Sequence, residues 1–244
     1  MSCKQLSRHF GGLVAVKDVS LMLERGTIHS VIGTNGAGKS TLINLLSGEL
    51  KPSSGQINLL GQDASNWSQA RRARAGLGRS YQRNTIYPEF SVLENCRLSA
   101  QAHAQRAWAI WIHAQRDSHT LDTARRVARL VGLDSVLDRP AGFLSHGQKR
   151  QLEIAMCLAI SPQILLLDEP LAGMGAEESE RMLGLLIALK REHAILLVEH
   201  DMDAVFKISD LITVMVNGSV IASGPPEEVR NNPLVRTAYL GEHA

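Results

Sequence analysis

One eight-residue stretch, Gly33–Ser40, constrains the fold of this chain more than any other. Its sequence GTNGAGKS matches G-x-x-x-x-G-K-[ST], the pattern of a phosphate-binding loop. The apolar segment 27–32 before it predicts a buried strand, and the run 41–47 after it predicts a helix that stops at Gly48. Strand, glycine loop and helix form the context that the motif needs, because the glycines aim several N–H groups at one anion and the helix adds its positive end.

Individual residues of this loop are expected to have distinct roles. Lys39 is expected to reach the β- and γ-phosphates of a nucleotide, and the Ser40 hydroxyl is expected to ligate Mg²⁺. The residues expected to surround the phosphates are Gly33, Asn35, Gly36, Ala37, Gly38, Lys39, Ser40 and Thr41.

The rest of the chain mostly alternates short apolar runs with helical patterns. Strands are expected at 19–23, 56–60, 77–81, 164–167 and 194–198, helices at 68–74, 145–160 and 176–190, and a hairpin from 211–216 to 220–222. This rhythm predicts an α/β fold of the P-loop NTPase type. Its mostly parallel sheet is covered on both faces and carries an antiparallel β annex.

Residues 91–135 break the alternation, since they carry helical patterns without a strand signal. Ser91–Glu94 is a capping box that opens a helix, and a second helix is expected at about 120–131. Ala104, Trp108, Trp111 and Ile112 share one helical face, which indicates a small core or, less favoured by that spacing, a docking surface. We interpret this block as a helical subdomain. The predicted domains are therefore a RecA-like core at 1–82 and 160–244 and a helical subdomain at 83–159.

Two carboxylates follow the strand expected at 164–167. A strand that ends in Asp168 and Glu169 presents both at the carboxyl edge of the sheet, where open α/β folds bind ligands. Asp168 is suited to the Mg²⁺ shell, and Glu169 is placed to polarise a water that attacks the γ-phosphate. The alternative is a solvated acidic strand end, and the phosphate loop favours the catalytic interpretation.

The segment Leu144–Gln148, LSHGQ, opens another helix and has two interpretations. Ser145 and Gln148 form an S-x-x-Q capping box, so the segment can simply begin a helix. A helix start that contains Ser145 and Gly147 and no acidic residue is also an anion site. The phosphate loop elsewhere in the chain favours the second interpretation, in which Ser145, Gly147 and Gln148 bind a phosphate.

Three single residues are ambiguous on their own. Phe10 precedes a Gly-Gly turn and is either a core residue or an aromatic that stacks on adenine. Gln82 ends a strand and can contact Mg²⁺ or the lytic water, although a glutamine alone is uninformative. His200 follows the strand at 194–198 and can contact the γ-phosphate, but a lone histidine there is more often structural.

Composition argues against several other classes of protein. The net charge of +2 and the 4% aromatic content argue against a nucleic-acid partner or a base-stacking surface. The sequence has neither an apolar run of the roughly 20 residues needed to span a bilayer nor a signal-peptide core. Its three cysteines are far apart, which fits a reducing compartment and no metal framework.

Taken in order, the phosphate loop, Gln82, LSHGQ, Asp168–Glu169 and His200 closely resemble the ATPase subunit of ABC transporters, over essentially the whole chain. The resemblance implies ATP and Mg²⁺ as cofactors, and a dimer in which ATP lies between the phosphate loop of one subunit and the Ser-x-Gly-Gln helix of the other. It also implies roles for the three ambiguous residues: Gln82 contacts Mg²⁺, His200 contacts the γ-phosphate, and Phe10 stacks on adenine.

A narrower resemblance rests on other stretches, namely FGGLVAV from Phe10, YPEFSVLEN from Tyr87, QLEIA from Gln151, AGMG from Ala172, VEHDM from Val198 and AYLG from Ala238. They look like the ATPases of branched-chain amino acid uptake systems, and the urea-uptake ATPases share many of them. This resemblance implies two permease subunits, a second ATPase subunit that is identical or different, and a periplasmic binding protein that acts indirectly. The implied location is peripheral, on the cytoplasmic face of the cell membrane.

Three positions depart from the family pattern. His146 replaces a usual glycine, which should leave Ser145 and Gly147 able to bind phosphate. Gly175 stands where the loop after the Walker B strand usually ends in Asp or Asn, which weakens a role for this loop in positioning water. The segment Met1–Leu6 leaves little room for the family's first strand, so we expect a truncated or mis-assigned start.

Other functions compete with that of a transport ATPase. The alternative solute is urea or another amide, since the urea-uptake ATPases share many of these stretches. The permease, rather than this chain, selects the solute. A soluble ATP-driven clamp of the same superfamily would separate Lys39 from Asp168 by long coiled coils, and this chain has no heptads there. A non-hydrolysing binding module is disfavoured because Lys39, Asp168, Glu169 and His200 are all present.

Overall fold

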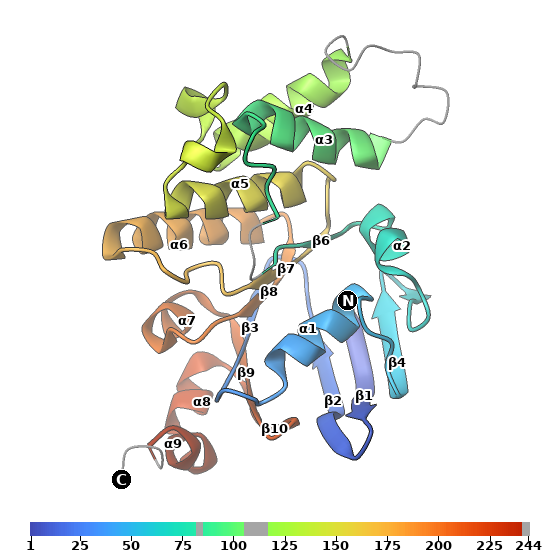
Figure 1. Cartoon of the computed structure of the whole chain (residues 1–244). Coiled ribbons are helices and arrows are strands. Elements are labelled where there is room, and N and C mark those ends of the chain that lie inside the picture. The colour runs from blue at the N-terminus through green and yellow to red at the C-terminus, as the bar shows by residue number, and fades with distance from the viewer. Residues whose placement is uncertain (82–84, 105–116, 241–244) are drawn as a thin grey trace. The chain divides into compact units, whose positions relative to one another are not determined.

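The computed structural model describes residues 1–81, 85–104 and 117–240 (Figure 1). The chain forms two compact units. One, which we call the core unit, comprises Met1–Arg79, Gln163–Glu169 and Leu186–Ala244. The other, the helical unit, comprises Ser80–Pro162 and Pro170–Leu185, so it includes the segment 170–185 beyond the residues expected in a helical subdomain.

The core unit contains a six-stranded sheet with the order β10-β9-β3-β8-β7-β6. Its strands are β3 (Ile28–Gly33), β6 (Leu77–Arg79), β7 (Ile164–Asp168), β8 (Ala194–Val198), β9 (Leu211–Val216) and β10 (Ser219–Gly224). All neighbours are parallel except β9 and β10, whose hairpin turns at Asn217 and Gly218 with φ of 47° and 79°. These positive angles match the predicted type I′ turn. The mostly parallel sheet is confirmed.

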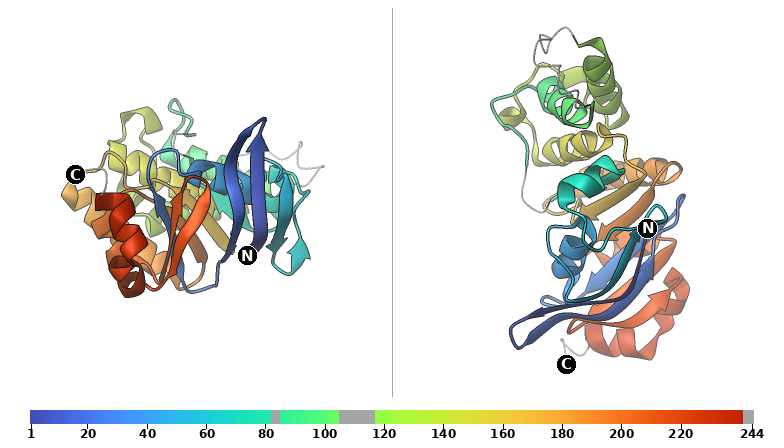
Figure 2. Two further views of the ribbon diagram at one scale, coloured as in Figure 1. Left: turned by 90° about the horizontal axis from the view of Figure 1, so that it is seen from below. Right: turned by 90° about the vertical axis from the view of Figure 1, so that its right-hand side faces the viewer.

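A second, antiparallel sheet has the order β2-β1-β4-β5, from β1 (Ser2–Phe10), β2 (Leu13–Met22), β4 (Ser54–Leu59) and β5 (Gln62–Asp63). Figure 2 shows β1 and β2 running alongside one another as a long hairpin. The expectation of little room for a first strand is wrong, because β1 starts at Ser2. Its register slips between Cys3 and Leu6, and Gln5 has a φ of 47°. This irregularity breaks the period-2 pattern by which a strand is recognised in sequence.

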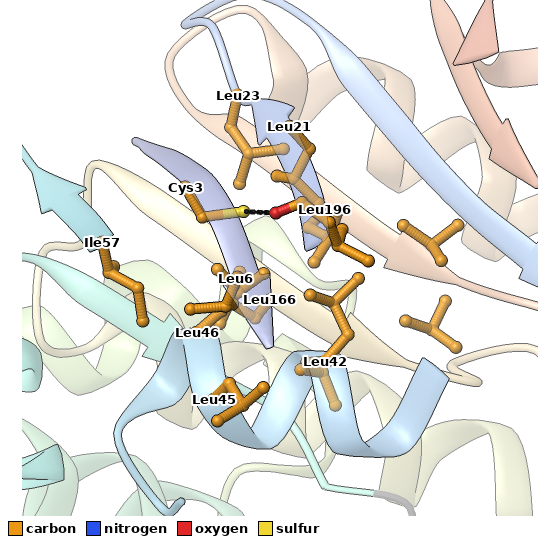
Figure 3. Packing of buried hydrophobic residues seen from close by; sticks show 14 of the residues in the cluster. Cys3, Leu6, Leu21, Leu23, Leu42, Leu45, Leu46, Ile57, Leu166 and Leu196 are labelled. Atoms are coloured by element: carbon orange, nitrogen blue, oxygen red, sulfur yellow. Dashed lines mark hydrogen bonds between the residues drawn. The ribbon is translucent and has the colours of Figure 1, made fainter. Parts of the chain in front are cut away.

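Helices cover both faces of the six-stranded sheet. The helix α1 (Lys39–Ser47) packs on one face, where Leu42, Leu45 and Leu46 join residues of both sheets in one buried cluster (Figure 3). On the other face Ile32 packs with Val205 of α7 (Met202–Ile208), and with residues of α8 (Pro226–Asn231) and α9 (Pro233–Leu240). Val31 of β3 belongs to the first cluster and its neighbour Ile32 to the second, so adjacent residues of this strand face opposite sides of the sheet. A short helix, α2 (Gln69–Arg74), is capped by the Ser68 hydroxyl.

The helical unit is built from α3 (Val92–Ala104), α4 (Ser118–Leu130), α5 (His146–Leu158) and the residues of α6 (Ala176–Lys190) up to Leu185. Short 3₁₀ turns occur at Asp134–Val136 and Ala141–Phe143. The Ser91 hydroxyl caps α3 as predicted, while the Glu94 carboxylate binds Arg97. Trp108, Trp111 and Ile112 lie outside the described residues, so the interpretation of that face stays a prediction.

All three cysteines are buried, and none of them forms a disulfide. Burial raises the pKa of Cys3 to about 11 and that of Cys96 to about 12, so neither is ionised at neutral pH. Within the ranges that the structure describes, no helix combines the length and the apolarity needed to cross a bilayer.

Candidate functional site

The phosphate loop connects β3 to α1 as the motif predicts. Gly36 and Gly38 adopt φ of 80° and 99°, angles that residues with a side chain rarely adopt. A Cβ on Gly38 would also collide with the carbonyl oxygen of Ala15. The helix α1 begins without an acidic residue in its first turn and without a side-chain cap. Its positive end is therefore available to an anion. Ser40 is exposed at this helix start.

Lys39 folds back over the loop. Its ammonium donates to the carbonyl oxygens of Gly33 at 2.5 Å and Thr34 at 3.1 Å. Burial lowers the pKa of the Lys39 ammonium, and the charges of Glu169 and Asp168 partly oppose this shift. The ammonium therefore lies near two carboxylates. Its two hydrogen bonds to backbone carbonyl oxygens can be exchanged for hydrogen bonds to phosphate oxygens.

The carboxylates reach this place because three parallel strands end together. In the sheet register Val198 of β8 pairs with Val31 of β3 on one side and with Asp168 of β7 on the other. The phosphate loop, Asp168–Glu169 and His200 consequently lie along one carboxyl edge of the sheet, where open α/β folds bind ligands. Glu169 has a φ of 49°, and its N–H donates to the carbonyl oxygen of Val198 at 2.9 Å. A non-glycine residue held at this angle is strained, as residues at functional sites often are.

His200 is not packed in a core. Its side chain is 65% exposed, and its Nδ1 lies 3.7 Å from a carboxylate oxygen of the buried Glu199. That carboxylate also accepts from the His200 backbone N–H at 3.2 Å. The backbone is held while the imidazole stays accessible at the sheet edge.

Phe10 ends β1 and is 43% exposed, which rules out a core phenylalanine. The Arg8 guanidinium lies over its ring, 4.6 Å from the centroid. Such a cation–π contact orients the ring, which favours the interpretation that Phe10 presents a ring face to a ligand.

The helical unit carries the start of α5. Ser145 and Gln148 form the predicted capping box, with the Ser145 hydroxyl accepting from the Gln148 backbone N–H at 3.2 Å. Ser145, Gly147 and Gln148 also line a pocket of about 340 Å³ together with Met174, Glu178 and Arg181. The helix start is thus both capped and open to a cavity.

A carboxylate that sequence reasoning missed sits at this helix start. The Ser145 hydroxyl donates to Glu178 of α6 at 3.2 Å. A Cβ on Gly147 would lie 2.8 Å from the same carboxylate oxygen, so a larger residue there would displace the Glu178 carboxylate. In the sequence Glu178 is one of several acidic residues in the first turns of a helix, which the helix dipole alone explains. The sequence contains no signal for a contact across 33 residues.

The unusual His146 has a specific partner. Its Nε2 lies 2.8 Å from the carbonyl oxygen of Ala172, so Nε2 carries a proton and donates it. The replacement therefore ties the start of α5 to the loop that follows β7. The other predicted site residue, Gln82, lies outside the described residues.

Three comparisons place this geometry among known proteins. The family model described as "ABC transporter" matches residues 16–172, and the model described as "Branched-chain amino acid ATP-binding cassette transporter" matches residues 219–244. The chain is 40% identical to the high-affinity branched-chain amino acid transport ATP-binding protein LivG of Salmonella typhimurium, with 97% of this chain and 96% of the relative covered. It is 37% identical to BraF of Pseudomonas aeruginosa, with the same coverage.

Solved structures agree with these relatives. A nucleotide-free ATP-binding cassette from an ABC transporter superposes with a TM-score of 0.88 at 28% identity, covering 98% of this chain and 97% of that chain. The ADP conformation of another ABC transporter cassette gives a TM-score of 0.88 at 29% identity, with 98% of both chains covered. A dimeric bacterial ABC transporter cassette has the same fold, with a TM-score of 0.80 at 22% identity over 92% of this chain and 98% of that chain.

Proposed function

This chain belongs to the ABC transporter family of ATP-binding proteins, and we propose that it powers the import of branched-chain or other hydrophobic amino acids. Membership makes it a nucleotide-binding transport ATPase. The main observation behind the proposal is the shared sheet edge. There the charges of the Asp168 and Glu169 carboxylates act on the Lys39 ammonium and favour its protonated form. The solute class rests on relatives that are high-affinity branched-chain amino acid transport proteins and on the match at 219–244.

In the proposed ATP site Lys39 exchanges its two carbonyl partners for the β- and γ-phosphates, and the loop N–H groups at Gly33–Thr41 surround them. Glu169 holds the attacking water and accepts its proton, while His200 donates to the γ-phosphate. Phe10 stacks on the adenine. The rate gain comes from placing these groups before the reaction rather than from a covalent step.

A divalent cation fits the oxygen donors at this edge. The Ser40 hydroxyl and the Asp168 carboxylate are hard ligands of the kind that Mg²⁺ prefers, and Gln82 would add an amide oxygen. A bound Mg²⁺ would neutralise charge on the β- and γ-phosphates. The fit rests on the chemistry of these donors.

We propose that each site is completed by a second ATPase chain, identical or different. Ser145, Gly147 and Gln148 of the second chain would bind the γ-phosphate through the positive start of α5. The Glu178 carboxylate now at that helix start would have to move, because two anions cannot share one site without a large energetic cost.

The proposed partners are two permease subunits at the cytoplasmic face of the cell membrane, with a periplasmic binding protein acting through them. We place permease docking at Thr85–Glu94 in the helical unit. Tyr87 and Phe90 there are 54% and 44% exposed, and their ring centroids are 5.6 Å apart. The buried Asn95 amide shapes this loop, since it accepts from the Tyr87 N–H at 2.8 Å and donates to the Tyr87 and Phe90 carbonyl oxygens. Exposed aromatics on a fixed loop are suited to a protein contact.

Uptake measurements test the proposed solute. Cells that lack this chain should lose high-affinity uptake of radiolabelled leucine, and the wild-type chain should restore it while Lys39→Ala should not. Loss of urea uptake with normal leucine uptake would instead support the urea or amide alternative. A chain that never sediments with membranes, even when its permeases are present, would favour a soluble clamp.

Cross-linking tests the docking site. A cysteine at Tyr87 or Glu89 should form a disulfide with a cytoplasmic loop of the permease, because both positions are exposed on the docking loop. A cysteine at Ser2, on the core unit, serves as the control. Cross-links from other positions together with none from Tyr87 or Glu89 would exclude this site.

A further inference from the structure

The C-terminal end of α1 is held by a buried guanidinium that comes from α2. Arg72 is 0% exposed, and its Nη1 donates to the carbonyl oxygens of Leu45 and Leu46, each at 2.7 Å. Its Nη2 donates to the carbonyl oxygens of Ala64 at 2.8 Å and Ser65 at 3.4 Å. One side chain therefore joins the last turn of α1 to the segment that precedes α2, and all of these residues belong to the core unit.

This guanidinium supplies a charge that α1 itself lacks. The last carbonyl groups of a helix have no partner within it and carry a partial negative charge, which a cation compensates. The last turn of α1 contains no basic residue. Gly48 provides an ordinary glycine cap, with a φ of 84° and its N–H bonded to the Leu45 carbonyl oxygen. Arg72 is therefore an addition to a helix end that already has a cap.

The surroundings of Arg72 favour its geometry, rather than charge pairing, as the reason for its burial. Within the described ranges none of its partners is a carboxylate, and its Nε is buried without a hydrogen bond. Burial lowers the pKa of the guanidinium, because the charge loses its hydration. A Cβ on Gly48 would lie only 2.9 Å from this Nε, so a larger residue there would displace the Arg72 side chain. What the guanidinium contributes is a planar group that bonds two segments at a fixed spacing.

The opposite end of α1 belongs to the phosphate site. Lys39 is its first residue, and the helix has nine residues, so its two ends are about 14 Å apart. Buried leucines pack the helix against the sheet (Figure 3), but apolar contacts are not directional. Hydrogen bonds are directional, and those of Arg72 define where the helix ends along its own axis. A shift of that end would also move Lys39 and the loop before it, because the backbone hydrogen bonds of the helix keep its length fixed.

We propose that Arg72 is a positioning residue for nucleotide binding, which fixes α1 along its axis and so holds Lys39 and the phosphate loop where they bind phosphates. The proposal rests on the proposed ATP site, in which Lys39 and the N–H groups at Gly33–Thr41 surround the β- and γ-phosphates. Arg72 does not touch the nucleotide and acts through the helix. The segment before α2 thereby becomes part of the frame that holds the phosphate site.

Equilibrium binding of MgATP to the full chain tests the proposal. Arg72→Met removes the charge, whereas Arg72→Lys keeps the charge but cannot bond both segments in the same geometry. The Kd for MgATP should rise by about tenfold in Arg72→Met, the size of one lost hydrogen bond to a charged group, and by at least about threefold in Arg72→Lys. The effect stays moderate because Arg79 still bonds the Ser47 hydroxyl at the same helix end.

Two results would overturn the proposal. One is an unchanged MgATP affinity in both folded variants. The other is full affinity in Arg72→Lys, because the charge alone would then be sufficient. Arg72→Lys is also the variant that decides if Arg72→Met does not fold.

Val229→Ala is the control for a general loss of stability. Val229 is 1% exposed and belongs to a cluster on the other face of the same sheet, which contains no residue of α1. Its truncation lowers the melting temperature through a cavity. Even a half-unfolded protein has an apparent Kd only about twofold higher, so this variant should stay within that limit. A tenfold loss of affinity in Val229→Ala as well would assign the effect to stability and contradict the positioning role.

Amide hydrogen exchange shows whether the effect passes through the helix. The Leu42 N–H donates to the Gly38 carbonyl oxygen at 2.9 Å, at the start of α1. In the nucleotide-free Arg72→Lys chain this amide should exchange faster than in wild type, relative to the amides of β8. In Val229→Ala the ratio should stay as in wild type. An unchanged ratio in Arg72→Lys would contradict transmission along α1.

Lys39→Ala separates this proposal from the proposed ATP site and function. Unchanged MgATP affinity in Lys39→Ala would refute the phosphate site itself, whereas unchanged affinity in the Arg72 variants alone would refute only the positioning role. If the Arg72 variants lose affinity while cells without this chain still take up leucine normally, the proposed import function fails and the positioning role stands.

Discussion

At the scale of single residues, Glu169 is the proposed general base. It follows the buried Asp168 at the end of β7, and its backbone is held at a φ of 49° by a bond to Val198. Glu169→Gln keeps the shape and removes the basic oxygen. We predict normal MgATP binding and an ATPase rate lower by about a hundredfold or more. Equilibrium nucleotide binding and phosphate release check this, and near-normal hydrolysis would mean that another residue activates the water.

Glu178 is the residue whose effect is least expected from sequence. Its carboxylate accepts from Ser145 and lies against Gly147, where the proposed partner phosphate arrives. Glu178→Gln keeps a hydrogen-bond acceptor and removes the negative charge. We predict a half-saturating ATP concentration for dimer formation lower by about two- to fivefold, the size of a charge effect at a helix end.

Glu177→Gln is the control for that experiment. Glu177 is the neighbouring residue of the same helix turn. Its side chain is 87% exposed, and it pairs with Arg181 at 3.6 Å rather than with the start of α5. Both variants lose one negative charge, so a general charge effect would move them equally. Weaker ATP-driven dimer formation in Glu178→Gln would show instead that the carboxylate supports Ser145.

At the scale of elements, most regular patterns were predictable, whereas β1 and α7 were not. The helix at Ala176–Lys190 and the strand at Ala194–Val198 match the expected bounds, because caps, charges and continuous apolar runs mark their ends. The strand β1 was missed because its register slips around Gln5. The helix α7 spans only seven residues, too few for a helical period to stand out, although Asp201 caps it.

The strand β3 contains a buried histidine that makes the core unit sensitive to acid. His29 is 3% exposed; its Nδ1 lies 2.9 Å from the Met22 carbonyl oxygen and its Nε2 lies 2.8 Å from the Thr213 hydroxyl. A carbonyl only accepts, so Nδ1 carries the proton and Nε2 accepts from the hydroxyl, which describes a neutral ring. Burial lowers the pKa of His29 below its ordinary value of 6.5.

This geometry predicts how stability changes with pH. Above pH 6.5 the His29 ring is neutral in both the folded and the unfolded chain, so protonation of His29 does not reduce the free energy of unfolding. Below it the unfolded chain takes up the proton first, so the free energy of unfolding falls until the pH reaches the lower folded pKa. His193, whose pKa burial also lowers, adds to the same trend. Urea unfolding between pH 8 and pH 5 should show this fall, and His29→Asn should flatten it; a fall of the same steepness in His29→Asn would assign it to other groups.

At the scale of the whole molecule, the sequence predicts which chemical groups the site contains better than it predicts their contacts. The phosphate loop, Asp168 and the capping box at Ser145 are local patterns, so they are legible in sequence. The long-range contacts are not local: Arg150 reaches Tyr81 and Ser145 reaches Glu178. No periodicity encodes such contacts, because packing decides them after the elements have formed. The exposure of Phe10, ambiguous in sequence, likewise followed only from the fold.

In the proposed dimer each ATP site takes Lys39 from one chain and Ser145 from the other. Lys39→Ala removes the charge on the phosphates, and Ser145→Arg blocks the helix end that binds them, so each variant alone should give inactive homodimers. Mixing the two places both lesions in one site and leaves the other site with two wild-type halves. Mixed dimers should therefore regain part of the ATPase activity, measured after subunit exchange has been verified by a tag on one variant. The absence of recovery in exchanged dimers would count against ATP sites that are each built from two chains and work independently of one another. If the natural partner is a chain of different sequence, the same experiment is done with one lesion on each chain.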